Sequence, residues 1–146
     1  MKFMRKLINS KVLLIIAMIS FFTACNENDN EAVLKNESVI VDNNLHTNTA
    51  VNNYTITAVK IEGNLLTLKI SSSGCSGNSW KAVLVDANEI LESYPVQRNV
   101  KLALENSESC LAVFEKEFTF DITILKAGFS EVILNLEGWS TQINYN

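Results

Sequence analysis

The chain has 146 residues, of which 12 are basic and 16 are acidic, giving a formal net charge of −4. This length is enough for one domain of ordinary size. The acidic balance disfavours binding to nucleic acid, because an acidic surface repels phosphate backbones.

The first 24 residues have the layout of a secretory signal peptide. Four basic residues and no acidic one precede an apolar run over residues 12–22, which only Ser20 interrupts. This run is too short to cross ~30 Å of hydrocarbon comfortably, which argues against a transmembrane anchor. We therefore expect residues 1–24 to be removed, which leaves eight basic and sixteen acidic residues and a formal net charge of −8.

Residues 22–25, Phe-Thr-Ala-Cys, resemble the lipobox of bacterial lipoproteins, in which Leu is commoner than Phe at the first position. The resemblance implies that Cys25 carries a diacylglycerol and that the signal is cut just before it. Several acyl chains hold a protein firmly, since each buried methylene contributes ~0.8 kcal/mol. We predict attachment to the outer membrane through this N-terminal lipid. An ordinary thiol after an ordinary cleavage site is the alternative.

Residues 25–53 contain nine asparagines and few regularly spaced apolar residues. This composition predicts a flexible tether, in which residues 38–41 form either a short edge strand or more of the coil. The acidic residues Glu27, Asp29 and Glu31 resemble the export signal of surface lipoproteins in Bacteroidota, which implies exposure at the cell surface. A solvated linker is the other interpretation.

From Tyr54 onward, apolar and polar residues alternate with the period of a strand that buries one face. The alternation predicts strands over residues 54–61, 66–71, 80–85, 100–105, 118–124, 132–137 and 141–145, separated by turn residues. Residues 86–94 are either a helical turn or a loop. We therefore predict an all-β domain over residues 54–146, an antiparallel β-sandwich, immunoglobulin-like or related, of about seven to eight strands.

Residues 71–80, Ser-Ser-Ser-Gly-Cys-Ser-Gly-Asn-Ser-Trp, resemble a functional site more than any other stretch of the chain. A catalytic thiol needs a base, normally His, and the single histidine, His46, lies in the predicted tether. A serine nucleophile elbow would need Gly at position 78, and a phosphate loop would need Lys after Gly77; the chain has Asn78. Two cysteines and one tether histidine do not make a closed zinc site. We predict no catalytic residue, cofactor or metal.

The two cysteines that remain after lipidation are Cys75 and Cys110. Export places them in an oxidising compartment, which favours a disulfide between them. In the chain-entropy model such a bridge stabilises the fold by about 3–4 kcal/mol. Two reduced, buried thiols are the alternative. Trp80 is expected in the core near the bridge.

Carboxylates offer two further candidate sites. Glu115, Glu117 and Asp121 resemble paired acids of a hydrolase, but their shared parity along one strand indicates a solvated face. The sequence from Asp86 to Glu89 offers oxygen ligands without the spacing of a calcium loop.

A resemblance to small Bacteroidota lipoproteins of unknown function covers residues 54–146. It rests on Gly74-Cys75, Trp80, residues 94–98 (Tyr-Pro-Val-Gln-Arg), residues 110–112 (Cys-Leu-Ala) and residues 118–122 (Phe-Thr-Phe-Asp-Ile). Such proteins often carry a His shortly after the first cysteine, where this chain has Asn78-Ser79. The resemblance implies fold and location but no activity.

The sequence thus predicts a membrane-anchored, non-catalytic module that binds a protein or glycan ligand or serves a structural role. A carboxylate-dependent hydrolase that uses Asp121 with a neighbouring Glu is one alternative. An accessory subunit of a surface complex is another.

Overall fold

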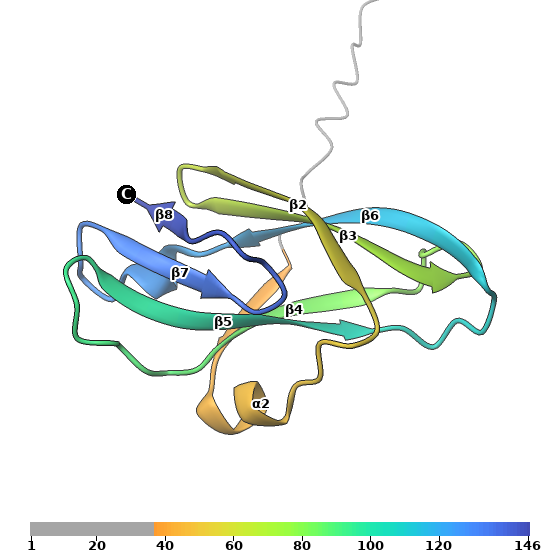
Figure 1. The fold of residues 1–146 in the computed structure, drawn as a ribbon, viewed down its shortest axis with the longest axis horizontal. Coiled ribbons are helices and arrows are strands. Elements are labelled where there is room, and N and C mark those ends of the chain that lie inside the picture. The colour runs from red at the N-terminus through yellow and green to blue at the C-terminus, as the bar shows by residue number, and fades with distance from the viewer. Residues whose placement is uncertain (1–36) are drawn as a thin grey trace, which may run out of the picture. The chain divides into compact units, whose positions relative to one another are not determined.

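A computed structural model describes residues 37–146, which form an all-β unit (Figure 1). Its strands are β1 (Ser38–Val41), β2 (Thr55–Glu62), β3 (Leu65–Gly74), β4 (Lys81–Asp86), β5 (Val96–Glu105), β6 (Ala112–Asp121), β7 (Val132–Leu136) and β8 (Ile143–Tyr145). The helices among these residues are short: α2 (Asn43–Asn48) and the 3-10 turn η1 (Thr123–Lys126).

The strands form two sheets. One has five strands in the order β1-β4-β5-β7-β8, and the other has three in the order β2-β3-β6. The prediction of an antiparallel fold is wrong for two pairs, because β1 runs parallel to β4 and β5 runs parallel to β7. Neither pair is joined by a hairpin. The chain passes through the other sheet between them, and such crossovers permit parallel neighbours.

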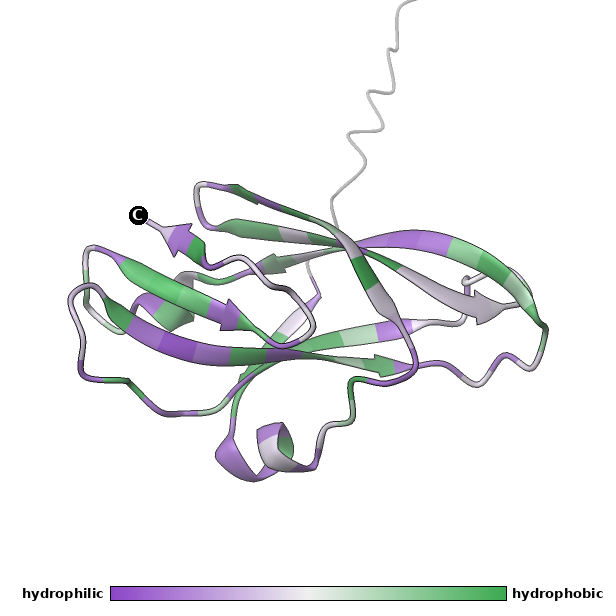
Figure 2. Cartoon of the chain, in the orientation of Figure 1, coloured by the Kyte–Doolittle hydropathy of each residue, from purple (hydrophilic) through white to green (hydrophobic). Residues whose placement is uncertain are grey.

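The core is built by every second residue of both sheets, as the alternation predicts. Leu66, Leu68 and Ile70 of β3 are fully buried, as are Val100 and Leu102 of β5. Together with Phe118 and Phe120 of β6 they belong to a single hydrophobic cluster that draws on both sheets. The short helix α2, in contrast, is mostly hydrophilic and buries no residue (Figure 2).

The folded unit begins before Tyr54, the predicted start of the β domain. The open possibility of a strand over residues 38–41 is confirmed as β1, which pairs with the otherwise free edge of β4. Val39 and Val41 pack against the core. Asp42 then starts α2 by accepting a hydrogen bond from the backbone N–H of Leu45 at 2.7 Å. The Asn-rich composition therefore left the strand undecided and gave no indication of the helical turn.

The strand predicted over residues 118–124 ends earlier, at Asp121. The Asp121 carboxylate accepts hydrogen bonds from the backbone N–H and the hydroxyl of Thr123, at 3.0 and 2.6 Å, and so bends the chain into η1. Leu125 is consequently buried, whereas Ile124 is 60% exposed. Residues 86–94 contain no helix: Asp86 ends β4, and residues 87–94 form a loop whose Leu91 bridges to Gln97.

A buried ion pair closes the core-facing side of the sheet where β4 ends. The guanidinium of Arg98 donates two hydrogen bonds to the carboxylate of Asp86, one of them from Nε to Oδ2 at 2.8 Å. The side chains are only 6% and 0% exposed. The backbone N–H of Asn88 donates a further hydrogen bond to Asp86 at 2.7 Å. The carboxylate is thus fully engaged by its own chain.

Replacing Asp86 by Ala should destabilise the protein by about 3–5 kcal/mol, because it leaves the Arg98 charge buried without a partner. The double variant Asp86→Leu/Arg98→Met should lose much less, since no charge remains to be desolvated. Urea denaturation of the purified variants measures both effects. Equal losses in the single and double variants would contradict this account of the pair.

Candidate functional site

Two crossover segments carry the chain between the sheets at one end of the domain. Residues 75–80 lead from β3 to β4, and residues 106–111 lead from β5 to β6. They lie side by side because β3 pairs with β6 up to Gly74↔Ala112, while β4 pairs with β5 from Lys81↔Glu105. The predicted disulfide is confirmed: Cys75 and Cys110 join the two crossovers across a Cα–Cα distance of 4.9 Å.

Both cysteines are exposed, but the indole beside them is in the core, as expected. Trp80 is only 3% exposed. Its ring packs so closely on the backbone of Gly74, the neighbour of Cys75, that a Cβ there would stand 3.1 Å from it. The same Cβ would stand only 2.5 Å from a carboxylate oxygen of Glu108, so the glycine is required chiefly by that approach. The bridge sits on the outside of a well-packed corner.

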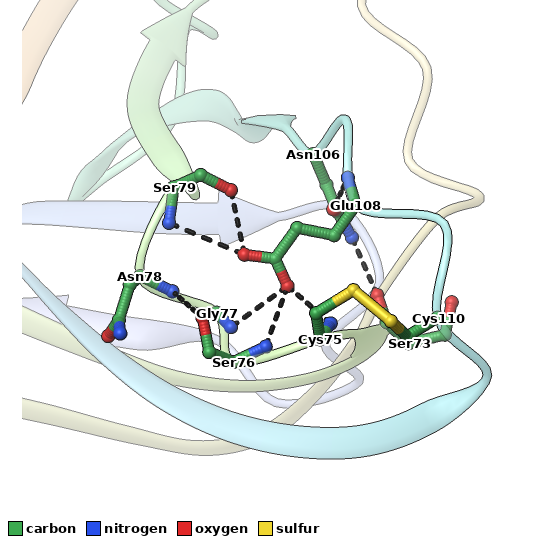
Figure 3. Close-up of a disulfide and its surroundings, with 9 residues drawn as sticks. All are labelled: Ser73, Cys75, Ser76, Gly77, Asn78, Ser79, Asn106, Glu108 and Cys110. Carbon is green, nitrogen blue, oxygen red and sulfur yellow. Dashed lines mark hydrogen bonds between the residues drawn. A yellow bond between two sulfur atoms is a disulfide. The ribbon is translucent and has the colours of Figure 1, made fainter.

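The bend around Cys75 forms an anion cradle, and the chain fills it with its own Glu108 (Figure 3). One carboxylate oxygen of Glu108 accepts hydrogen bonds from the backbone N–H groups of Cys75, Ser76 and Gly77, the last two at 2.9 and 3.0 Å. The other oxygen accepts from the hydroxyl of Ser79 at 2.7 Å. Gly77 has φ +70°, which lets successive N–H groups converge on one point.

The cradle strongly favours the ionised form of Glu108. Hydrogen bonds from the backbone of Ser76 and Gly77, and then from Ser79, lower the pKa of Glu108 from 4.5 to about 2. Asn106 orients this side of the crossover by donating to the backbone oxygen of Ser73 at 2.8 Å and accepting from the N–H of Glu108 at 3.0 Å. The site-like stretch is therefore a structural clamp that combines a disulfide with a bound carboxylate.

The carboxylates considered for a hydrolase lie on an exposed strand face, as their parity predicts. Glu115 pairs with Lys69 at 2.7 Å, and this hydrogen bond and charge lower the pKa of Glu115. Hydrogen bonds from the side chain and backbone of Thr123 lower the pKa of Asp121. A general acid needs a raised pKa. The pKa values of Glu115 and Asp121 are lowered instead, so both carboxylates are held in the ionised form.

The loop from Asp86 to Glu89 does not present a set of free ligand oxygens. Asp86 is bound to Arg98, and Glu89 accepts a hydrogen bond from the amide of Asn43 at 2.8 Å. Within residues 37–146, no group of three or more His, Cys, Asp or Glu side chains is arranged to hold a metal ion.

A concave, polar site lies instead on the outer face of the five-stranded sheet. Its strand amides, Asn99 and Asn135, alternate with buried core residues and so face away from the core, and α2 lies along the same face (Figure 1). The cavity has a volume of about 330 Å³. It is lined by His46, Asn99, Val100, Asn135, Leu136, Glu137, Trp139, Ser140, Thr141 and Gln142.

Four amide side chains form a hydrogen-bonded network at this cavity. Asn99 of β5 and Asn135 of β7 are direct neighbours in the parallel pair. Asn135 donates to the side-chain oxygens of Gln97 and Asn99 at 3.0 and 3.2 Å. Gln142 donates to those of Gln97 and Asn135 at 3.3 and 3.2 Å. The network fixes the amide heads in place without any charge.

The charged and titratable groups around the cavity leave it neutral near pH 7. Glu137 forms an ion pair with Lys101 at 3.1 Å. Burial, followed by the nearby charge of Lys101, lowers the pKa of His46 from 6.5, which keeps the imidazole uncharged. Its Nε2 is inaccessible and has no hydrogen-bond partner among the described residues.

Sequence reasoning missed both the cradle and the cavity. The cradle has a weak signal in hindsight, because two glycines flank a cysteine among serines and an acid stands two residues before the second cysteine. The cavity has no such signal, because the amides that line it come from positions 99, 135 and 142, and Gln97 joins them through hydrogen bonds. Their proximity depends on β5 and β7 being neighbours. His46, the single histidine considered as a base for a catalytic thiol at Cys75, lines this cavity instead.

The predicted signal peptide, the lipidation site Cys25 and the acidic residues after it lie outside the described residues. Among residues 37–146, no helix is long and apolar enough to cross a membrane.

The fold is similar to solved structures of two Bacteroidales proteins. One is a protein of unknown function from Bacteroides vulgatus, with a TM-score of 0.50 and 12% identity. The other, from Parabacteroides distasonis, has a name that suggests a relation to toxins, a TM-score of 0.51 and 10% identity. Each match covers 75% of this chain but only 54% and 61% of the respective neighbour. At this identity the likeness shows the fold alone. No family model and no curated protein matches the chain.

Replacing Cys75 or Cys110 by Ala should destabilise the protein by similar amounts, about 3–4 kcal/mol in the chain-entropy model. The double variant should be no worse than either single one, because the two residues act as one covalent unit. Urea denaturation tests the energies. In a Cys25→Ser background, titration of the denatured, unreduced protein should find no thiol, and two thiols per chain would refute the bridge.

Replacing Glu108 by Gln should remove a stabilisation that depends on pH. Because the folded-state pKa is lowered from 4.5 to about 2, the contribution of Glu108 is fully present above pH 4.5 and is lost as the pH falls toward 2. The gap in urea midpoint between the unmodified protein and the variant should therefore close over this range. The control is Asn78→Ala, for which the difference in urea midpoint from the unmodified protein should not vary with pH, whatever its size. A pH-independent gap for Glu108→Gln would contradict the clamp.

Proposed function

We propose that the chain is a lipid-anchored protein of the bacterial envelope whose β domain is a ligand-binding module. The cavity on the outer face of the five-stranded sheet is its binding site. The observation that carries the proposal is the neutral network of oriented amides at this cavity, which Trp139 and His46 also line. Ligand sites are concave and present a few well-placed polar groups, and this cavity has both properties.

The two sheets are proposed to pack as a sandwich of a type related to the immunoglobulin fold. A single hydrophobic cluster that draws on both sheets supports this arrangement. In such a scaffold the outer face of a sheet is free to carry a ligand site, because the opposite face already supplies the core.

The anchor is proposed to be an acylated Cys25, with the residues between it and β1 as the linker. The lipobox-like residues 22–25 and the basic, then apolar, start of the chain support this location. The hydrolase alternative draws no support from Glu115 and Asp121, which are exposed and have lowered pKa values.

Replacing Cys25 by Ser should abolish incorporation of an alkyne-labelled fatty acid into the protein in growing cells, because the acyl acceptor is removed. The protein should also keep its signal peptide, which a gel shift or mass spectrometry detects. The control is Cys75→Ser, which alters another cysteine and should label like the unmodified chain. Equal labelling of the Cys25→Ser variant would show that the fatty acid is attached elsewhere in the chain and would contradict the proposed anchor.

A further inference from the structure

The amide network at the cavity has hydrogen-bonding capacity that the protein itself does not use. Asn135 donates twice and accepts once within the network. Among the described residues, the NH₂ groups of Gln97 and Asn99 donate to no protein atom, and the side-chain oxygen of Gln142 accepts from none. The cavity therefore presents free donors and a free acceptor at fixed positions.

A ligand that satisfies this pattern must both donate and accept hydrogen bonds at neighbouring points. Hydroxyl groups do so, whereas carboxylates and phosphates only accept and ammonium groups only donate. The charges around the cavity also favour an uncharged ligand. Glu137 is neutralised by Lys101 at 3.1 Å, and the lowered pKa of His46 keeps it uncharged, so a charged ligand finds no counter-charge.

The wall beside the amides adds an apolar contact. Trp139 is half-buried, packs against the core and is also one of the residues that line the cavity. A tryptophan offers a large, rigid apolar face, which fits the C–H face of a sugar ring while the ring hydroxyls turn to the amides.

An extended peptide fits this surface less well. Peptides commonly bind by adding a strand to a free sheet edge or by filling a row of apolar pockets. Here β5 is flanked by β4 and β7, and β7 is flanked by β5 and, over Val132–Leu134, by β8. Among the described strands beneath the cavity, the free edge is limited to the last residues of β7, Asn135 and Leu136. Trp139 is the one aromatic residue among those that line it.

We propose that this cavity binds a neutral oligosaccharide, with one sugar ring against Trp139 and its hydroxyls on Asn99 and Gln142, and with Gln97 offering a further donor beside the cavity through the same network. This inference rests on the proposed function and names the class of ligand. The cavity volume of about 330 Å³ lies at the lower end of the range for small-molecule sites, so the contact involves a short stretch of the saccharide.

The test is an NMR titration of the lipidated protein, extracted from its membrane in a detergent that contains no sugar. The signals followed are the side-chain amides of Gln97 and Asn99 and the indole N–H of Trp139. The neutral probes are the hexasaccharides of maltose, cellulose, mannan and xylan type. The comparison probes are hexagalacturonic acid, the chitosan hexamer and the peptide acetyl-(Gly-Ser)₃-amide. At least one neutral hexasaccharide should shift these signals saturably and more strongly than every comparison probe.

Variants separate a binding role from a structural one. Trp139→Ala should weaken the affinity at least about tenfold, as expected for a central aromatic contact, whereas Trp139→Phe keeps an aromatic face and should retain most of it. Asn99→Asp preserves shape, replaces a free donor by an anion and should also lose about tenfold, which keeps the test decisive if Trp139→Ala unfolds. Asn78→Ala, an exposed amide in the distant crossover, is the control and should bind like the unmodified protein.

The outcomes separate this inference from the function on which it rests. Stronger shifts with the peptide or a charged oligosaccharide at the same amide signals would overturn the carbohydrate assignment and leave the binding module standing. If neither the probes nor a total extract of the cell envelope shifts these signals, the carbohydrate assignment and the proposed binding function are both overturned. Binding that survives Asn99→Asp and Trp139→Ala unchanged would place the saccharide elsewhere and overturn the assignment of this cavity.

Discussion

The bound carboxylate of Glu108 is the contact on which the corner of the fold depends. Residues 75–79 leave one sheet before they join the other, so their backbone N–H groups have no strand partner, and Glu108 satisfies several of them at once. The disulfide acts on the same two crossovers through different physics. The bridge restricts the unfolded chain, whereas the carboxylate satisfies donors in the folded one. Neither link replaces the other: a bridge leaves the N–H groups unpaired, and a carboxylate exerts no hold once the chain unfolds.

This corner determines what can form at the opposite end of the domain. Once β5 is directed into β6 by the clamped crossover, the chain must return through η1 before it can rejoin the first sheet, and it does so parallel to β5 as β7. The turn before β3 holds this return, because the backbone oxygen of Asn64 accepts from the N–H of Ile122 at 2.9 Å and its side chain accepts from Tyr145 at 2.8 Å. The parallel pair then sets Asn99 beside Asn135. The amide cavity is thus a product of topology more than of any local motif.

The same distinction explains what the sequence predicts and what it hides. The strands around Leu66 and Phe118 are visible because alternation is a local property, and the Cys75–Cys110 bridge follows because lipidation of Cys25 would leave one pairing. The end of β6 at Asp121 is hidden, since a single side-chain bond to Thr123 overrides an alternation that continues to Ile124. The parallel strand order, and the edge that β1 joins, are hidden for a different reason. Each depends on which edge is free after the other strands have paired, and no residue spacing encodes that.

The proposed anchor and the proposed ligand site are connected by energetics. An amide that exchanges a water molecule for a sugar hydroxyl gains little net free energy, about 0.5–1.5 kcal/mol for each neutral hydrogen bond, and the cavity supplies neither a counter-charge nor a metal ion within the described residues. A single site of this kind binds modestly. The proposed lipid attachment would confine many copies to one surface, where a polymeric saccharide would contact several of them and the second contact would become intramolecular. This avidity would compensate for the weak affinity of each single cavity. The neutral site would remain selective on an acidic domain, since charged polymers gain no contact at the amides however many copies they meet.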